Sequence, residues 1–154
     1  MSERGVVVIT GASSGIGAAC AQYLDGLGFT VWAGVRRRED GEALVRLTSS
    51  RLRVVMLDVT DPASIAAAEQ VVAEATRDTG LAGLVNNAGI SVAGPLEVLP
   101  LDAVRMQFEV NVIGVLAVTQ AFIPLLRPAR GRIVNISSIA GLAATPFLGA
   151  YCGS

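Results

Sequence analysis

Short apolar runs alternate along this chain with longer segments in which apolar residues recur at helical spacing. A short run rich in valine and isoleucine, bounded by glycine or polar residues, is typical of a strand that is buried on both faces. Such strands belong to parallel sheets covered by helices, so the pattern predicts an α/β fold. The predicted strands are residues 6–10, 30–35, 53–57, 84–86 and 132–136.

Helical patterns occupy the longer segments. Residues 15–27 alternate small and apolar side chains and stop at Gly28, a residue type that commonly follows the last turn of a helix. Residues 64–79 are rich in alanine, which has the highest helix propensity. The remaining predicted helices are the short segment 41–47 and the long segment 101–126.

The length and composition suit a single domain with a buried core. Hydrophobic residues make up 52% of the 154 residues and charged residues 16%. The longest apolar stretch, residues 110–126, includes Asn111, Gln120 and Pro124, so we predict a buried helix rather than a membrane span. No linker, low-complexity tract or internal repeat is visible.

Composition also argues against several kinds of function. A net charge of −1 with scattered basic residues offers no surface for nucleic acid or an anionic membrane. The chain has no histidine, which removes Ser-His catalysis and histidine-ligated metal, and we expect no metal site. Cys20 and Cys152 lack disulfide or metal-type spacing, so both are expected to be reduced thiols. The N-terminus has no signal-peptide pattern, which favours a soluble, cytoplasmic protein.

A glycine-rich segment, TGASSGIG over residues 10–17, follows the first strand and opens a helical segment. Glycines here let the backbone turn tightly and approach a pyrophosphate, whose charge faces the N–H groups of the new helix. The segment therefore predicts a dinucleotide-binding loop. Its spacing is Gly-x-x-x-Gly-x-Gly rather than Gly-x-Gly-x-x-Gly, so the alternative is a turn that only needs small residues.

Arginines follow the second strand, where dinucleotide sites commonly carry an acidic residue that binds the adenosine ribose. Residues 35–38 read VRRR. A carboxylate would repel a 2′-phosphate, whereas a guanidinium grips one through its forked donors, so NADP(H) is favoured over NAD(H), with Arg36 as its ligand. Ser13 or Ser14 can add a hydroxyl bond. The alternatives are a solvated charge run over residues 36–40 and serines that only stabilise the loop.

With these residues in view, the chain closely resembles the short-chain dehydrogenase/reductase family from end to end. The resemblance rests on motifs that occur in the family's order: TGASSGIG at 10–17, Asp58-Val59, NNAG at 86–89, Asn111, and NISS at 135–138 followed by Tyr151. It implies a doubly wound parallel sheet, the Rossmann fold, with strand order 3-2-1-4-5 in one NAD(P)-binding domain over residues 1–154.

The resemblance also implies a set of cofactor-binding residues. Asp58 would bind the adenine amino group and Val59 would contribute a backbone contact, whereas Asn86 is expected to be structural and to tie neighbouring strand ends together. The implied set is Gly11, Ser13, Ser14, Gly15, Ile16, Gly17, Arg36, Asp58, Val59, Asn87, Ala88 and Gly89, with the last three beside the adenosine ribose.

The same resemblance implies a catalytic set of Ser138, Tyr151 and Asn111, because Ser138 precedes Tyr151 by the thirteen positions of the family pattern. Tyr151 would act as the acid in reduction and the base in oxidation, and Ser138 would hydrogen-bond the substrate oxygen. The backbone at Asn111 would hold a water in a proton relay. Taken by themselves, Ser138 could belong to a strand-end turn and Tyr151 could be a packing residue.

We therefore expect an NADP(H)-dependent oxidoreductase, a carbonyl reductase or alcohol dehydrogenase acting on a small-molecule alcohol or carbonyl compound. A non-catalytic NADP(H) sensor or scaffold is the alternative. A sugar-nucleotide epimerase or dehydratase fits less well, because those enzymes usually carry a Gly-x-x-Gly-x-x-Gly loop that Gly11, Gly15 and Gly17 do not match.

The resemblance further implies a lysine at position 155, which follows the 154 residues, and two more strands with the helices of the substrate pocket. An ordinary phenol has a pKa near 10, so ionising it at pH 7 costs about 4 kcal/mol, and a neighbouring ammonium lowers that cost. We expect the residues to be the front part of a longer polypeptide that forms a homo-oligomer, a dimer or tetramer. Residues 1–154 alone are expected to be inactive.

Overall fold

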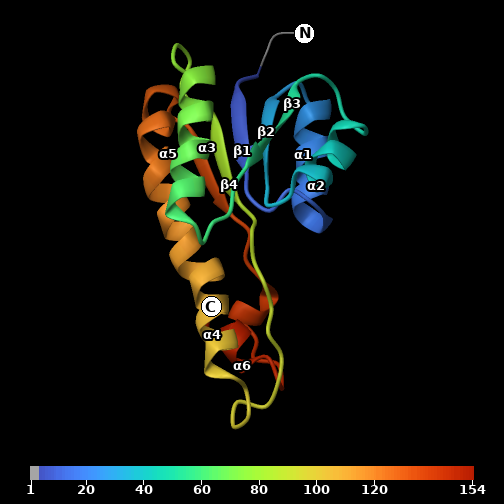
Figure 1. Cartoon of the computed structure of the whole chain (residues 1–154), viewed down its shortest axis with the longest axis vertical. Coiled ribbons are helices and arrows are strands. Elements are labelled where there is room, and N and C mark those ends of the chain that lie inside the picture. The colour runs from blue at the N-terminus through green and yellow to red at the C-terminus, as the bar shows by residue number, and fades with distance from the viewer. Residues whose placement is uncertain (1–3) are drawn as a thin grey trace.

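In the computed structural model, which describes residues 4–154, the described chain forms a sheet of five parallel strands in the order β3-β2-β1-β4-β5 (Figure 1). The predicted fold class and strand order are confirmed, and each observed strand end lies within one residue of its prediction. The strands are β1 (Val6–Ile9), β2 (Thr30–Val35), β3 (Leu52–Met56), β4 (Gly83–Asn86) and β5 (Arg132–Asn135).

The register aligns the carboxyl ends of the strands at one edge of the sheet. Ile9 of β1 lies opposite Ala33 of β2 and Val85 of β4. Strand order reverses between β1 and β4, and in doubly wound sheets a ligand crevice forms at such a switch point. The segments that leave β1, β2, β3 and β4 at this edge carry the predicted cofactor residues.

Side chains of β1 alternate between the two faces of the sheet, as the period of a strand requires. Val7 and Ile9 pack on the face covered by α1 (Gly15–Gly26) and α2 (Arg38–Val45). Val6 and Val8 pack on the face covered by α3 (Pro62–Ala75) and α5 (Val115–Ala129), where Phe122 is fully buried. Figure 1 shows these two helix layers on opposite sides of the sheet.

Local chemistry explains where two helices begin. The helix predicted over 64–79 starts earlier, at Pro62, because the Asp61 side chain accepts a hydrogen bond from the backbone N–H of Ala63 at 2.9 Å and proline suits the first helical position. The helix predicted over 41–47 starts at Arg38, which places Glu39 and Asp40 in the first turn, where negative charge is favourable.

The long helix predicted over 101–126 is interrupted. It consists of α4 (Leu101–Phe108), a π-helical segment η1 (Glu109–Gly114) and α5. Length and composition alone would let the helix Leu101–Ala129 cross a membrane, yet Val118 and Phe122 face the core between α5 and the sheet. A π-helical segment inside a long helix often marks a functional site.

Below the carboxyl edge of the sheet, the segments after β4 and β5 extend along α4 (Figure 1). The segment after β5 includes a short 3₁₀ turn, η2 (Ile139–Gly141), and the single-turn helix α6 (Gly149–Cys152). All four residues of β5 are exposed. Cys20 and Cys152 are free thiols, as expected from their spacing.

Candidate active site

The glycine-rich segment forms the turn between β1 and α1. Gly11 and Gly15 have φ values of 63° and 55°, in the left-handed region where glycine is favoured over other residues. Gly17 is buried beneath the turn. Ser13 and Ser14 are exposed, and Ser14 occupies the N-cap position of α1 without a side-chain capping bond, which leaves its hydroxyl available to a ligand.

The start of the NNAG segment holds this turn in place. Nδ2 of Asn87 donates to the carbonyl oxygens of Thr10 and Gly11, both at 3.0 Å. Oγ1 of Thr10 accepts from the backbone N–H groups of Asn87 at 3.0 Å and Ala88 at 2.9 Å. The Asn87 side chain is therefore committed to the loop. Sequence reasoning gave Thr10 no role of its own, because a hydroxyl at a strand end is only a weak signal of a functional residue.

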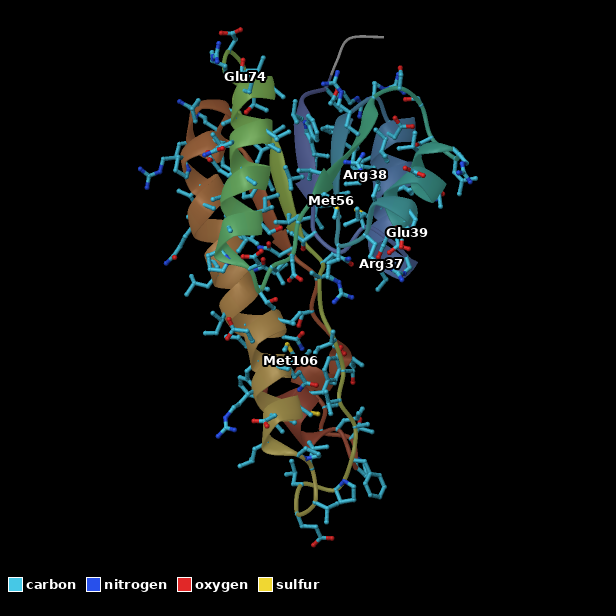
Figure 2. The ribbon with its side chains drawn as sticks, viewed as in Figure 1. Arg37, Arg38, Glu39, Met56, Glu74 and Met106 are labelled. Atoms are coloured by element: carbon cyan, nitrogen blue, oxygen red, sulfur yellow. The ribbon has the colours of Figure 1, made fainter. Side chains whose placement is uncertain are left out.

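A pocket of about 400 Å³ opens at the carboxyl edge. It includes nine of the predicted cofactor residues but not Gly15, Ile16 or Gly17, and none of the predicted catalytic residues lines it. Figure 2 labels Met106, which contributes to the pocket from α4. The lining residues are Gly11, Ser13, Ser14, Arg36, Leu57, Asp58, Val59, Thr60, Asn87, Ala88, Gly89, Ile90, Met106 and Val110.

Asp58 is held as a carboxylate at the pocket wall. The backbone N–H of Thr60 donates to Oδ1 of Asp58 at 2.9 Å, and the Thr60 hydroxyl donates to the same oxygen at 2.7 Å. These two hydrogen bonds, with a smaller contribution from the charge of Arg36, hold the pKa of Asp58 below its ordinary value. Thr60 is a second residue that sequence reasoning missed.

The neighbouring arginines after β2 have different environments. Arg37, labelled in Figure 2, binds Asp40 through Nε and Nη2, each at 3.0 Å, and this contact raises the pKa of the guanidinium. Arg38 lines a separate hollow of about 390 Å³ between α2 and β3. Of the three, Arg36 is the one that lines the pocket, and its role as the phosphate ligand stays a prediction.

The elements that carry Ser138 and Tyr151 are in contact. Ser138 caps η2, and its Oγ accepts from the backbone N–H of Ala140 at 3.2 Å, which orients the oxygen and leaves the hydroxyl proton free to be donated. Tyr151 lies half-buried in α6, which packs against both η2 and α4. The fold thus brings together two segments that are predicted to share one substrate oxygen.

Asn111 lies in η1 and bonds both backbone groups of Ile90. Its Oδ1 accepts from the Ile90 N–H, and its Nδ2 donates to the Ile90 carbonyl oxygen, both at 2.9 Å. This use of the side chain leaves the backbone as the part of Asn111 that can hold a water.

Asn86 ties strand ends together, as expected. Its Nδ2 donates to Oδ1 of Asn135 on β5 at 2.9 Å and to Oγ1 of Thr119 on α5 at 3.0 Å. The bond to Asn135 links the end of β4 to the end of β5 just before the segment that carries Ser138.

Comparison with known families shows which protein family this chain belongs to. The family profile described as short chain dehydrogenase matches residues 5–154. This chain belongs to the short-chain dehydrogenase family.

Curated relatives of this chain include several named oxidoreductases. Retinol dehydrogenase 16 of Homo sapiens is 47% identical over 147 residues, which cover 95% of this chain and 46% of that protein. The 17-beta-hydroxysteroid dehydrogenase type 6 of Homo sapiens is 49% identical over 149 residues, covering 96% and 47%. The mitochondrial D-beta-hydroxybutyrate dehydrogenase of Rattus norvegicus is 41% identical over 152 residues, covering 95% and 44%. The chain spans about half the length of the curated relatives it matches.

Solved structures share the fold of this chain. A short-chain dehydrogenase from Streptomyces avermitilis superposes with a TM-score of 0.88 at 34% identity, covering 97% of this chain and 55% of that chain. Serine dehydrogenase from Escherichia coli gives a TM-score of 0.88 at 26% identity, covering 96% and 68%.

The loop of this chain fits the NAD(P) that the family binds. A Cβ atom built on Gly15 would meet no atom within 4 Å, so the backbone there borders open space. The adjoining pocket combines exposed serine hydroxyls and a guanidinium for phosphate groups with a carboxylate oxygen for an amino group. These groups complement the charged and polar parts of a dinucleotide.

Proposed function

We propose that this protein is an oxidoreductase that uses NADP(H) to interconvert an alcohol and a ketone or aldehyde, with Tyr151 as the acid and base. The observation that carries the proposal is the pocket of about 400 Å³, built from the nucleotide motifs. A chain of hydrogen bonds runs from Ile90 in its wall through Asn111 to Ser154, beside the turn of Tyr151.

The chain's residues supply binding and protons. When bound, the nicotinamide supplies or accepts the hydride. Ser13, Ser14 and the N-terminus of α1 would bind the phosphates, and Asp58 would accept from the adenine amino group. Excluding water from this edge strengthens each of these polar contacts.

Tyr151 and Ser138 would act on the reacting oxygen. As a carbonyl carbon is reduced, its oxygen gains negative charge and needs a proton, which the Tyr151 hydroxyl donates; in the reverse direction the phenolate accepts the proton of the alcohol. The Ser138 hydroxyl donates a hydrogen bond to the same oxygen. Because its Oγ is already oriented by Ala140, this donor is preorganised toward the developing charge.

The substrate that we propose has a bulky apolar body. The segments beside Tyr151 expose Leu96, Ile139, Leu142 and Phe147. The backbone N–H of Gly94 donates to the Phe147 carbonyl oxygen at 2.8 Å, which joins the segment that carries Leu96 to the segment that carries Phe147. Relatives named for retinol and hydroxysteroids agree with a substrate of this kind better than the relative named for hydroxybutyrate.

The catalytic proposal is tested in the full-length protein with NADPH and a panel of aliphatic, steroid and retinoid carbonyls. We expect Tyr151→Phe to lower kcat/KM at least about 100-fold, because the proton donor is removed. Tyr23→Phe is the matched control, since Tyr23 is 68% exposed on α1. Equal activity of the two variants would refute the acid–base role. Tight NADPH binding without any turnover by the wild type would leave the sensor or scaffold function.

The cofactor preference is tested by measuring Kd for NADPH and NADH in two arginine variants. Arg36→Ala should weaken NADPH binding about 10- to 100-fold and NADH binding less than about threefold, because a charge-assisted bond to the 2′-phosphate is lost. Arg37→Ala is the control, since that guanidinium is already bound to Asp40. Equal losses for the two cofactors in Arg36→Ala would contradict the assignment.

A further inference from the structure

Gln107 is the one buried residue of α4, and its exposed fraction is 0%. A buried amide is unfavourable unless its polar atoms are hydrogen-bonded, so packing alone would favour an apolar residue here. Oε1 of Gln107 accepts from the backbone N–H of Val92, and Nε2 donates to the hydroxyl of Ser154 at 3.2 Å. The amide therefore links two segments that are far apart in sequence.

The Ser154 hydroxyl uses all of its hydrogen-bonding capacity. Its Oγ accepts from Nε2 of Gln107 at 3.2 Å and from Nδ2 of Asn111 at 3.0 Å, and it donates to the carbonyl oxygen of Tyr151 at 3.1 Å. A serine hydroxyl has one donor and two acceptor sites. All three sites are filled here, so replacing this hydroxyl removes the acceptor of two amide groups at once.

The other ends of this network lie at Ile90 in the pocket wall and at nearby Val92. Asn111 bonds both backbone groups of Ile90, and Ile90 lines the pocket. Gln107 binds the backbone of Val92, two residues further along. The two amides, one turn apart along the helix, thus hold residues 90–92 on one side and the turn of Tyr151 on the other.

We propose that Gln107, acting through Ser154, is a positioning residue that fixes the turn of Tyr151 relative to the pocket wall. Gln107 is fully buried and does not line the pocket, so it would touch neither the reacting atoms nor the cofactor. It acts through the Ser154 hydroxyl, which donates to the carbonyl oxygen of Tyr151 and so ties the backbone of that turn to the buried amide. The inference rests on the proposed role of Tyr151, and its test separates the two.

The test is a double-mutant cycle in the full-length protein with Gln107→Met, Ser154→Ala and the double variant. Gln120→Met is the control, because it makes the same change at an exposed position of α5. We expect each single change to lower kcat for carbonyl reduction about tenfold while Kd for NADPH changes less than about threefold, because a small displacement of a proton donor slows chemistry without removing cofactor contacts. Both changes remove the bond between Gln107 and Ser154, so the double variant should lose clearly less than the product of the two single losses.

Amide hydrogen exchange gives a readout independent of turnover. The peptide 149–154 should exchange faster in both single variants and at the wild-type rate in Gln120→Met. Unchanged exchange, kcat within twofold of wild type, or fold-losses that multiply in the double variant would each overturn the inference. If the wild type binds NADPH but reduces no carbonyl, the proposed function fails. The exchange data still show whether Gln107 and Ser154 hold the turn of Tyr151. Ser154→Ala carries the test if Gln107→Met does not fold.

Discussion

At the scale of single residues, Gly17 and Gly26 occupy the same helix under opposite constraints. A Cβ atom on Gly17 would lie 2.4 Å from the carbonyl oxygen of Gly11 and 2.4 Å from Nδ2 of Asn87, well inside van der Waals contact. A Cβ atom on Gly26 would meet no atom within 4 Å. One substitution can therefore have opposite effects at the two ends of α1.

We predict that Gly17→Ala lowers the free energy of unfolding by about 1–3 kcal/mol, because overpacking forces the loop and Asn87 apart. It should also weaken NADPH binding at least about tenfold, because the displaced loop is the predicted phosphate site. Gly26→Ala should instead raise stability by about 0.5–1 kcal/mol through helix propensity. Urea unfolding and cofactor titration measure both quantities; a tolerated Gly17→Ala with unchanged affinity would refute the close contact.

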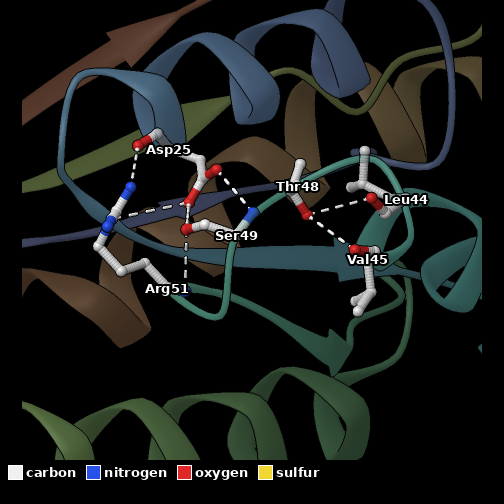
Figure 3. Close-up of polar contacts among 6 residues, drawn as sticks. All are labelled: Asp25, Leu44, Val45, Thr48, Ser49 and Arg51. Carbon is white, nitrogen blue, oxygen red and sulfur yellow. Dashed lines mark hydrogen bonds and ion pairs between the residues drawn. The ribbon is translucent and has the colours of Figure 1, made fainter.

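At the scale of elements, a polar cluster attaches the end of α1 to the segment that enters β3 (Figure 3). Asp25 is buried and accepts hydrogen bonds from the backbone N–H of Ser49 at 2.9 Å and from the Ser49 hydroxyl. Nη2 of Arg51 donates to the Asp25 carbonyl oxygen at 3.0 Å. The cluster supports the outer strand of the sheet from the helix layer.

The residues of this cluster should differ in their importance for stability. Asp25→Ala leaves the Ser49 N–H without its acceptor and should lower the free energy of unfolding by about 1–3 kcal/mol. Arg51→Ala should cost about 1 kcal/mol or less, because the Arg51 side chain is 43% exposed and solvent screens its charge. Asp78→Ala, at an exposed position, serves as the reference in urea unfolding. A larger loss for Arg51→Ala than for Asp25→Ala would contradict this order.

At the scale of the whole molecule, the strands of the sheet differ in how deeply they are buried. β1, β2 and β4 are buried throughout, whereas every residue of β5 is exposed and the strand pairs on one side only, with β4. An exposed strand edge with apolar side chains is a template for association with another chain. The predicted homo-oligomer of the full-length protein stays a prediction.

We predict that a chain of residues 1–154 self-associates through β5. Val134→Arg should reduce the associated fraction in sedimentation velocity over a concentration series, because a charge on the strand disfavours pairing with another edge. Val71→Arg is the matched control, since Val71 on α3 is 45% exposed and Val134 is 48% exposed. Equal association of the two variants would exclude β5 as the contact.

Local signals account for much of the candidate site. Nine predicted cofactor residues line one pocket because each belongs to a segment that leaves a parallel strand at the same edge. The contact between Gln107 and Ser154 joins positions 47 apart, and the bond from Asn87 to Gly11 joins positions 76 apart. No local pattern encodes such pairings, because a polar side chain finds its partner only after the elements have packed.

The sequence by itself determined the parallel sheet and the glycine loop, because hydrophobic periodicity and backbone sterics act over a few residues, whereas the strand order was implied by the resemblance to the family. The tertiary structure decided that α4 and α5 are joined by a π-helical segment, that Arg36 rather than Arg38 lines the pocket, and that a buried glutamine holds the turn of Tyr151. These features depend on burial and on distances between segments remote in sequence, and both arise only when the helices and the sheet pack together.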